Sequence, residues 1–206
     1  ADSSDTLLER LANRTSWSLR FRMQLAAEIP SLQVAGKKVA EIGCGSSLLS
    51  RVLISAGAQS YIGIDVSTAA IDRASLAAQS WDTKEQTSFQ ALEIMNIDHI
   101  DADIVFSLGL IDWLNDQEID HLFLLGSRAH FLHSFSERRA TISQQIHRAY
   151  VSIAYGLKTA GYRPRYFEAE KMISMSSRHN PKPSQIFRDR ALNFGALLTS
   201  LPLPEK

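Results

Sequence analysis

The feature that most constrains the fold is an apolar run ending in two glycines, Val-Ala-Glu-Ile-Gly-Cys-Gly at residues 39–45. Its apolar part suits a buried strand. Gly43 and Gly45 carry no Cβ atom, so the backbone there can turn sharply and approach a ligand closely. Ser46 and Ser47 precede apolar residues at helical spacing, so we expect a helix to begin there. The pattern predicts a strand, a glycine turn and a helix, the arrangement of a nucleotide-binding loop.

An acidic residue completes this pattern. Asp65 follows Gly45 by twenty residues, at the end of a second apolar segment, residues 60–64. A carboxylate there can accept hydrogen bonds from both hydroxyls of a ribose. In a dinucleotide fingerprint a third glycine would follow Gly45 by three positions, but that residue is Leu48. Glu41 would also repel a pyrophosphate. The segment therefore favours a cationic nucleoside without phosphates, and an NAD(P)-dependent oxidoreductase stays the alternative.

The pattern Glu-x-Gly-x-Gly with a later acid at a strand end resembles the class I S-adenosylmethionine-dependent methyltransferases, over about residues 37–114. The resemblance implies an α/β, single-domain Rossmann-like fold. Its sheet would be mostly parallel and seven-stranded, with helices on both faces and an antiparallel C-terminal strand. The implied cofactor is S-adenosylmethionine (SAM), with Glu41 near its methionine part and Asp65 on its ribose. The candidate cofactor-binding residues are Glu41, Gly43, Cys44, Gly45, Asp65, Val66, Glu93 and Leu108.

Two of these candidates have alternatives. Glu93 corresponds to the acid or amide that receives the adenine amino group in the family, and Asn96 and Asp98 are alternatives for that role. Cys44 is a small residue between two glycines and has no histidine close in sequence, so we do not expect a thiolate nucleophile.

The remaining periodicities predict the other elements. Helices are expected over residues 17–29, 70–81, 116–125, 142–157 and 167–176, and strands over 88–92, 104–108, 129–135, 185–188 and 191–200. We divide the single domain, residues 1–206, into an N-terminal helical cap (1–36), a cofactor-binding core (37–135), a helical insertion or lid (136–166) and a C-terminal helix with strands (167–206).

Composition limits the compartment. The single cysteine excludes an intramolecular disulfide, and we find neither a signal-peptide pattern nor an apolar run long enough to span a bilayer. A cytoplasmic protein is therefore expected. The chain begins at Ala1 rather than Met, which is compatible with its being a piece of a longer polypeptide.

Charge is divided unevenly along the chain. Residues 1–125 contain nine Lys and Arg against seventeen Asp and Glu, whereas residues 126–190 contain twelve against four. The acidic part agrees with a cationic cofactor, and the basic part with an anionic small-molecule substrate, an acidic partner or an anionic surface. Solvated helix faces are the alternative. The basic residues match no nucleic-acid-binding motif, so no nucleic-acid partner is expected.

The candidate substrate-binding residues are Trp113, Arg138, Arg139 and Arg148. Arg138 and Arg139 lie near the start of the helix expected after residue 141, where cations oppose the helix dipole. An anionic substrate group would compensate for this, and so would an ion pair with Glu137.

Methyl transfer from a sulfonium depends mainly on placing the nucleophile in line with the methyl group, so a base is optional. Asp112, in the loop after the fourth strand, and His133, at the end of the fifth, are the candidate catalytic residues. A helix cap or a surface carboxylate is the alternative for Asp112. The acidic stretch at residues 98–103 matches no metal-ligand spacing, so no metal is expected.

Together these features predict an enzyme that transfers a methyl group from SAM to an oxygen, or less readily a nitrogen, of an anionic small molecule. A non-catalytic SAM-binding scaffold is a second alternative. The acceptor and the oligomeric state do not follow from the sequence.

Overall fold

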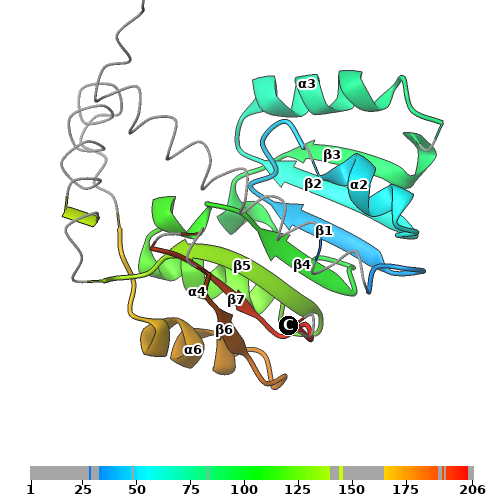
Figure 1. Ribbon diagram of the computed structural model, residues 1–206. Helices are drawn as coiled ribbons and strands as arrows, with labels where there is room; N and C mark the ends of the chain where they lie inside the picture. Colours follow the sequence, from blue (N-terminus) through cyan, green and yellow to red (C-terminus); the bar gives the residue numbers. More distant parts are fainter. Residues whose placement is uncertain are drawn as a thin grey trace, which may run out of the picture.

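The sheet of the protein contains seven strands in the order β3-β2-β1-β4-β5-β7-β6, as the computed structural model shows (Figure 1). The structure describes residues 28, 33–47, 49–82, 84–139, 144–145, 165–189, 192 and 194–203. The strands are β1 (Lys38–Ile42), β2 (Ser60–Asp65), β3 (Thr87–Ala91), β4 (Ile104–Ser107), β5 (His130–Ser136), β6 (Gln185–Phe187) and β7 (Gly195–Thr199). The first five strands are mutually parallel, and β7 runs antiparallel to both β5 and β6. The predicted fold is confirmed, including the antiparallel strand near the C-terminus.

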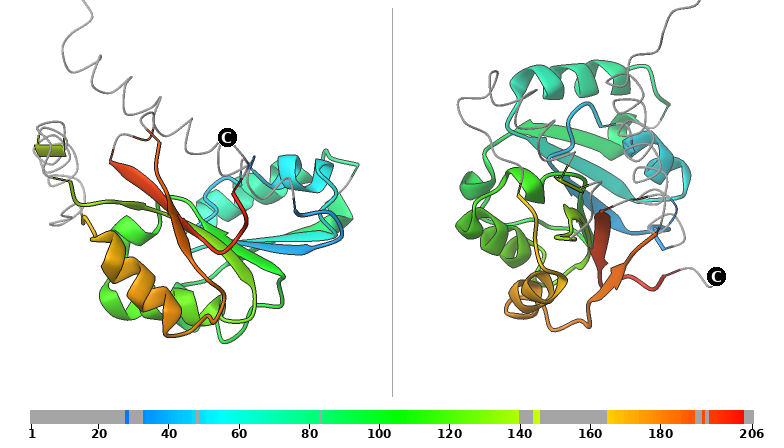
Figure 2. Two further views of the ribbon diagram at one scale, coloured as in Figure 1. Left: turned by 60° about the horizontal axis from the view of Figure 1, so that its bottom comes forward. Right: turned by 60° about the vertical axis from the view of Figure 1, so that its left-hand side comes forward.

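The helices follow from the direction in which the chain crosses the sheet. From β1 the chain runs through α2 (Ser50–Ser55) to β2 and through α3 (Thr68–Ala78) to β3, at one edge of the sheet. From β4 it runs through α4 (Asp116–Leu125) to β5, toward the other edge. Right-handed crossovers therefore place α4 on the face opposite α2 and α3. The last helix, α6 (Ala169–Ser177), packs near α4 (Figure 2). The short helical turns are η1 (Lys84–Gln86), η2 (Ile94–Asn96) and η3 (Ile111–Trp113).

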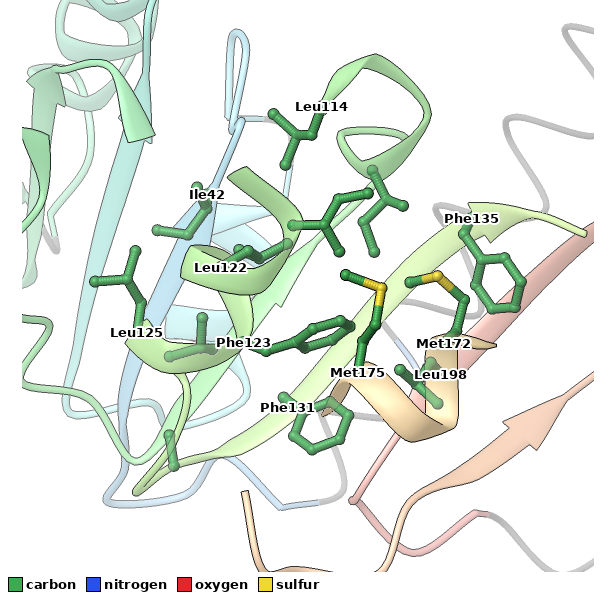
Figure 3. Packing of buried hydrophobic residues seen from close by; sticks show 14 of the residues in the cluster. Ile42, Leu114, Leu122, Phe123, Leu125, Phe131, Phe135, Met172, Met175 and Leu198 are labelled. Carbon is green, nitrogen blue, oxygen red and sulfur yellow. The ribbon is translucent and has the colours of Figure 1, made fainter. Parts of the chain in front are cut away.

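Two hydrophobic clusters, one on each face, hold these layers together. On the α2 face, Leu53 packs with residues of β1, β2 and β4. On the α4 face, Phe123 of α4 and Met175 of α6 point toward each other above Phe131 of β5 (Figure 3). Leu53 is fully buried, and Phe123, Phe131 and Met175 are no more than 4% exposed, so both faces of the central strands are removed from water.

Most predicted elements agree with the structure to within one to three residues, but the predicted start of the helix after β1 is wrong. α2 begins at Ser50, and its N-cap residue Leu49 makes no side-chain capping bond. Ser47, expected at the helix start, instead has a left-handed backbone with a φ of 55°. Its hydroxyl donates to the Tyr61 hydroxyl at 2.9 Å, so this side chain is engaged by β2 and does not cap the helix.

Two predicted helices fall outside the described residues. These are residues 17–29 and 142–157, apart from Glu28 and residues 144–145. The division into cap, core and lid therefore stays a prediction. No helix in the described part of the chain combines the length and the apolarity needed to cross a membrane.

Candidate functional site

The glycine loop lies at the carboxyl end of β1, next to the point where the strand order reverses. Open α/β sheets bind ligands in such a crevice. Gly43 and Gly45 have positive φ angles of 73° and 53°, a conformation that residues with a Cβ rarely adopt. The backbone N–H groups of Gly43 and Cys44 both donate to the Ile64 carbonyl of β2, at 2.7 and 3.1 Å. The loop is therefore folded back onto the end of β2.

Asp65 holds the same loop through its side chain. One carboxylate oxygen accepts from the Gly45 N–H and the other from the Ser67 N–H, both at 2.8 Å. The Asp65 carbonyl accepts from the Leu92 N–H just beyond β3, at 3.0 Å. Because a carboxylate has about four acceptor positions, these bonds leave Asp65 able to accept from two further hydroxyls.

A pocket of about 320 Å³ opens beside Asp65. It is mostly apolar, and three carboxylate-bearing residues line it, namely Asp65, Glu93 and Glu118. The other lining residues are Ile42, Gly43, Ile64, Val66, Leu92, Ile94, Met95, Leu110 and Leu114. The pocket could hold a nucleoside whose amino and hydroxyl groups donate hydrogen bonds.

Four of the lining residues are among the candidates from the sequence, and Glu118 is not. Gly43, Asp65, Val66 and Glu93 are all predicted residues that the structure brings together here. Glu118 was missed, although the Asn-x-x-Glu capping box to which it belongs is readable in the sequence. The alternatives to Glu93, Asn96 and Asp98, line a different hollow of about 610 Å³.

The loop after β4 forms one wall of the pocket through Leu110 and Leu114. A Cβ added to Gly43 would come within 3.0 Å of the Leu110 side chain, so glycine is required for this close approach. Leu108, the predicted contact in this segment, instead packs against the cluster on the α2 face and does not line the pocket.

Glu41 is buried beneath the loop and does not line the pocket. The Tyr61 hydroxyl donates to its carboxylate, and Ser47 in turn donates to Tyr61 at 2.9 Å. Burial raises the pKa of Glu41 to about 8, although the bond from Tyr61 lowers it. Near neutral pH the Glu41 carboxyl is therefore largely protonated. Sequence reasoning missed Tyr61, because no local pattern marks the partner of a buried acid on a neighbouring strand.

Cys44 is also buried, with its sulfur above Gly63. A Cβ at Gly63 would lie 2.9 Å from the sulfur. Burial, followed by the nearby Glu41 and Asp65, raises the pKa of Cys44 to about 12. The thiol therefore stays protonated, as expected for a residue that fills space.

His133 does not end the fifth strand, because β5 continues to Ser136. Its ring is fully buried, stacks on Phe131 at 5.5 Å, and lies 2.9 Å from the Ser107 hydroxyl through Nδ1. Burial lowers the pKa of His133 to about 3. The structure therefore places His133 in the core as a neutral residue, away from the pocket that Asp65 lines.

Asp112 and Trp113 lie in η3, between the two leucines of the pocket wall. Both oxygens of Asp112 accept hydrogen bonds from Ser136, one from its N–H at 2.8 Å and one from its hydroxyl at 2.7 Å. Trp113 is 53% exposed. Neither residue lines the pocket.

The arginines after β5 differ in their partners. Arg139 pairs with Glu137 at 2.7 Å, which is the local ion pair that the sequence left as an alternative. Arg188 pairs with the same carboxylate at 2.7 Å, and together these arginines lower the pKa of Glu137. Arg138 is held more loosely, with contacts of 3.4 Å to Glu168 and to a backbone carbonyl. Arg148 lies outside the described residues.

Within the described residues, no three His, Cys, Asp or Glu side chains lie close enough together to hold a metal ion. Among the described residues, the lining of the pocket combines three carboxylates with mostly apolar side chains.

Comparison with known proteins agrees with this geometry. Residues 39–129 match a family described as a methyltransferase domain, whereas no curated protein matches the chain in sequence. Magnesium protoporphyrin IX methyltransferase from Synechocystis, solved with bound SAH, is 18% identical with a TM-score of 0.66, and the match covers 97% of this chain and 88% of that one. Human N-acetylserotonin methyltransferase in complex with SAM is 14% identical with a TM-score of 0.63, and the match covers 93% of this chain and 55% of that one. A SAM-dependent methyltransferase from Mesorhizobium loti is 16% identical with a TM-score of 0.61, and the match covers 86% of this chain and 95% of that one.

At identities this low, the structural likeness establishes a shared fold alone. The matched residues 39–129 contain the glycine loop, Asp65 and the whole wall of the pocket. Domain match, strand order and pocket position agree: residues 39–129 match a methyltransferase domain, and the chain has the fold that S-adenosylmethionine-dependent methyltransferases of known structure share.

Proposed function

We propose that the pocket beside Asp65 binds SAM, and that the protein transfers the methyl group to an oxygen, less readily a nitrogen, of an anionic small molecule. The observation that carries the cofactor assignment is the Asp65 carboxylate. It lines the pocket, and the Gly45 and Ser67 N–H groups fix it in place while leaving acceptor positions for a ribose diol.

The polarity of the pocket supports a cofactor without phosphates. Three carboxylate-bearing residues, Asp65, Glu93 and Glu118, line it, and among the described residues that line it there is no Lys or Arg. A pyrophosphate would be repelled by such carboxylates, whereas the sulfonium and ammonium groups of SAM would be attracted. Because the pKa of buried Glu41 is about 8, this preference depends mainly on the three residues of the pocket.

A small, anionic acceptor is supported by two further observations. The named neighbours include methyltransferases for a porphyrin and for N-acetylserotonin, and their structures hold SAH and SAM. In this chain the Arg138 side chain, just beyond β5, is 65% exposed, and its contact with Glu168 is long, at 3.4 Å. Arg138 therefore has donors with which to bind a carboxylate or phenolate of an acceptor.

Calorimetric titration with SAM and its demethylated product SAH tests the cofactor assignment. Asp65→Ala should weaken binding of both by about 1 to 3 kcal/mol, the scale of losing hydrogen bonds to a charged group. Asp72→Ala, on exposed α3 surface, is the matched control and should bind like the wild type. Failure of the wild type to bind either compound at millimolar concentration would refute the assignment, and binding of reduced nicotinamide cofactor instead would favour the oxidoreductase.

The acceptor class needs its own measurement. Methyl transfer from labelled SAM should occur with carboxylate or phenolate compounds and not with their neutral analogues. Arg138→Ala should raise KM for the anionic acceptor without changing the affinity for SAH. Turnover of neutral acceptors alone would contradict the anionic assignment, and SAH binding without any turnover would favour a non-catalytic scaffold.

A further inference from the structure

We propose that Asp112 is a positioning residue which, together with Ser136 and Arg165, holds residues 109–114 in place as the wall of the cofactor pocket. This inference rests on the proposed SAM site. It gives Asp112 a role different from the base expected from the sequence.

The first attachment of the wall is to β5. The Gly109 N–H donates to the Ser134 hydroxyl at 2.6 Å, and the two oxygens of Asp112 accept from the N–H and hydroxyl of Ser136 at 2.8 and 2.7 Å. Ser134 and Ser136 are two residues apart on one strand, so they project on the same side. Both are at least 94% buried, which makes these bonds difficult for water to replace.

The second attachment comes from the other end of the wall. The Arg165 guanidinium donates to the Leu114 carbonyl and to the carboxylate of Asp116, and Lys171 donates to the same carboxylate at 2.9 Å. The guanidinium also lies over the Phe167 ring, 4.8 Å from its centroid. A planar group with several donors can hold a carbonyl and a carboxylate together, which lysine cannot do in the same way.

The two attachments are joined to each other. The Phe167 N–H donates to the Ser136 carbonyl at 2.9 Å, and the Arg138 N–H donates to the Phe167 carbonyl at 2.8 Å. Residues 165–168 therefore run beside the end of β5. Hydrogen bonds join η3 to β5, β5 to residues 165–168, and residues 165–168 back to the end of η3, in a closed circuit. Within this circuit Leu110 and Leu114 line the pocket.

This geometry explains why an acid is useful at position 112. A carboxylate accepts from both donors of Ser136 at once, and an asparagine offers only one oxygen for the same pair. The effect of Asp112 on the reaction is then exerted through the position of the leucine wall. A base would instead act on the acceptor without altering that wall.

Hydrogen exchange distinguishes these roles. The Trp113 and Leu114 N–H groups donate within η3, to the Leu110 and Ile111 carbonyls. In Asp112→Asn their exchange should accelerate about tenfold, equivalent to about 1.4 kcal/mol, while exchange in β4 is unchanged. SAH affinity should fall by a similar factor. Unchanged exchange and unchanged affinity would overturn the proposal, and a loss of turnover alone would assign Asp112 as a base.

Serine variants supply a rescue. Ser136→Ala should reproduce both effects, and Ser136→Thr, which keeps the hydroxyl, should restore them. Ser176→Ala is the matched control, because this buried hydroxyl bonds to the Ile173 carbonyl within α6 and to Ser184. Equal behaviour of Ser136→Ala and Ser136→Thr would contradict a role for the hydroxyl.

Arg165→Met keeps the proposal testable if the buried variants fail to fold. It should accelerate exchange of the Trp113 and Leu114 N–H groups and weaken SAH binding, whereas Arg178→Met should do neither. Arg178 is the control because its ion pair with Asp120 also joins α4 to the end of α6, at 3.1 Å, without touching the wall. A wild type that binds no SAH refutes the proposed function. A wild type that binds SAH with the same affinity as Arg165→Met and Asp112→Asn refutes only this inference.

Discussion

Replacing Glu41 by Gln should make the free energy of unfolding less sensitive to a rise in pH from 6 to 8. The Glu41 side chain is buried, and burial raises the pKa of its carboxyl from 4.5 to about 8, with Tyr61 opposing and Asp65 adding to the rise. Between these two values the folded protein holds the proton more tightly than the unfolded chain does. The contribution of Glu41 to stability is therefore fully present below pH 4.5 and falls, by up to about 1.4 kcal/mol per pH unit, until the pH passes the folded pKa. From pH 6 to pH 8 this amounts to about 2 kcal/mol, which a glutamine cannot lose because it does not titrate.

Urea unfolding at pH 6, 7, 8 and 9 measures this effect. The free energy of unfolding of Glu41→Gln, minus that of the wild type, should increase with pH by about 2 kcal/mol between pH 6 and pH 8. Glu85→Gln, at an exposed site, is the matched control and should show no such increase. A difference between Glu41→Gln and the wild type that stays constant with pH would refute the buried, protonated carboxyl.

Two further substitutions test the packing around the site. Gly63→Ala should destabilise the protein by about 1 to 3 kcal/mol, because its Cβ would lie 2.9 Å from both the Cys44 sulfur and the Phe89 ring. Cys44→Ala should recover part of that loss in the double variant, and unchanged urea midpoints would contradict the contact. Asn115→Ala removes the acceptor for the Gln117 and Glu118 N–H groups. It should cost about 1 kcal/mol in thermal or urea unfolding, and a wild-type midpoint would contradict the capping box.

Much of the fold was predictable because its signals are local. Residues 39–42, 60–64 and 104–108 are short apolar runs bounded by turn residues, and each matches the bounds of a parallel strand to within one residue. The right-handedness of the crossovers then determines the face of the sheet on which each connecting helix lies. The carboxyl ends of parallel strands meet at one edge, so the positions of Gly43 and Asp65 in one pocket also followed.

The glycine loop shows where local reasoning fails. Ser47 has the right residue type for a helix N-cap, but its hydroxyl bonds to Tyr61, fourteen positions away on β2. The helix then begins three residues later, at Ser50. The same tyrosine donates to Glu41, so one unrecognised residue accounts both for the wrong helix start and for an acid that does not line the pocket. A contact between strands is invisible to a pattern of neighbours along the chain.

The end of β5 makes the same point for function. In the sequence His-Ser-Phe-Ser, at residues 133–136, the histidine was the predicted catalytic residue because an imidazole can act as a base. Alternation along a strand separates these residues into two sets that face opposite sides of the sheet. His133 projects into the core beside Phe131, whereas Ser134 and Ser136 bond to the loop that lines the pocket. Because that loop carries the leucine wall, substitutions at the two serines should change SAH affinity more than substitution of the histidine, once each affinity is measured on folded protein. The strand contributes to the site through the residues that hold its wall, and residue type alone does not identify them.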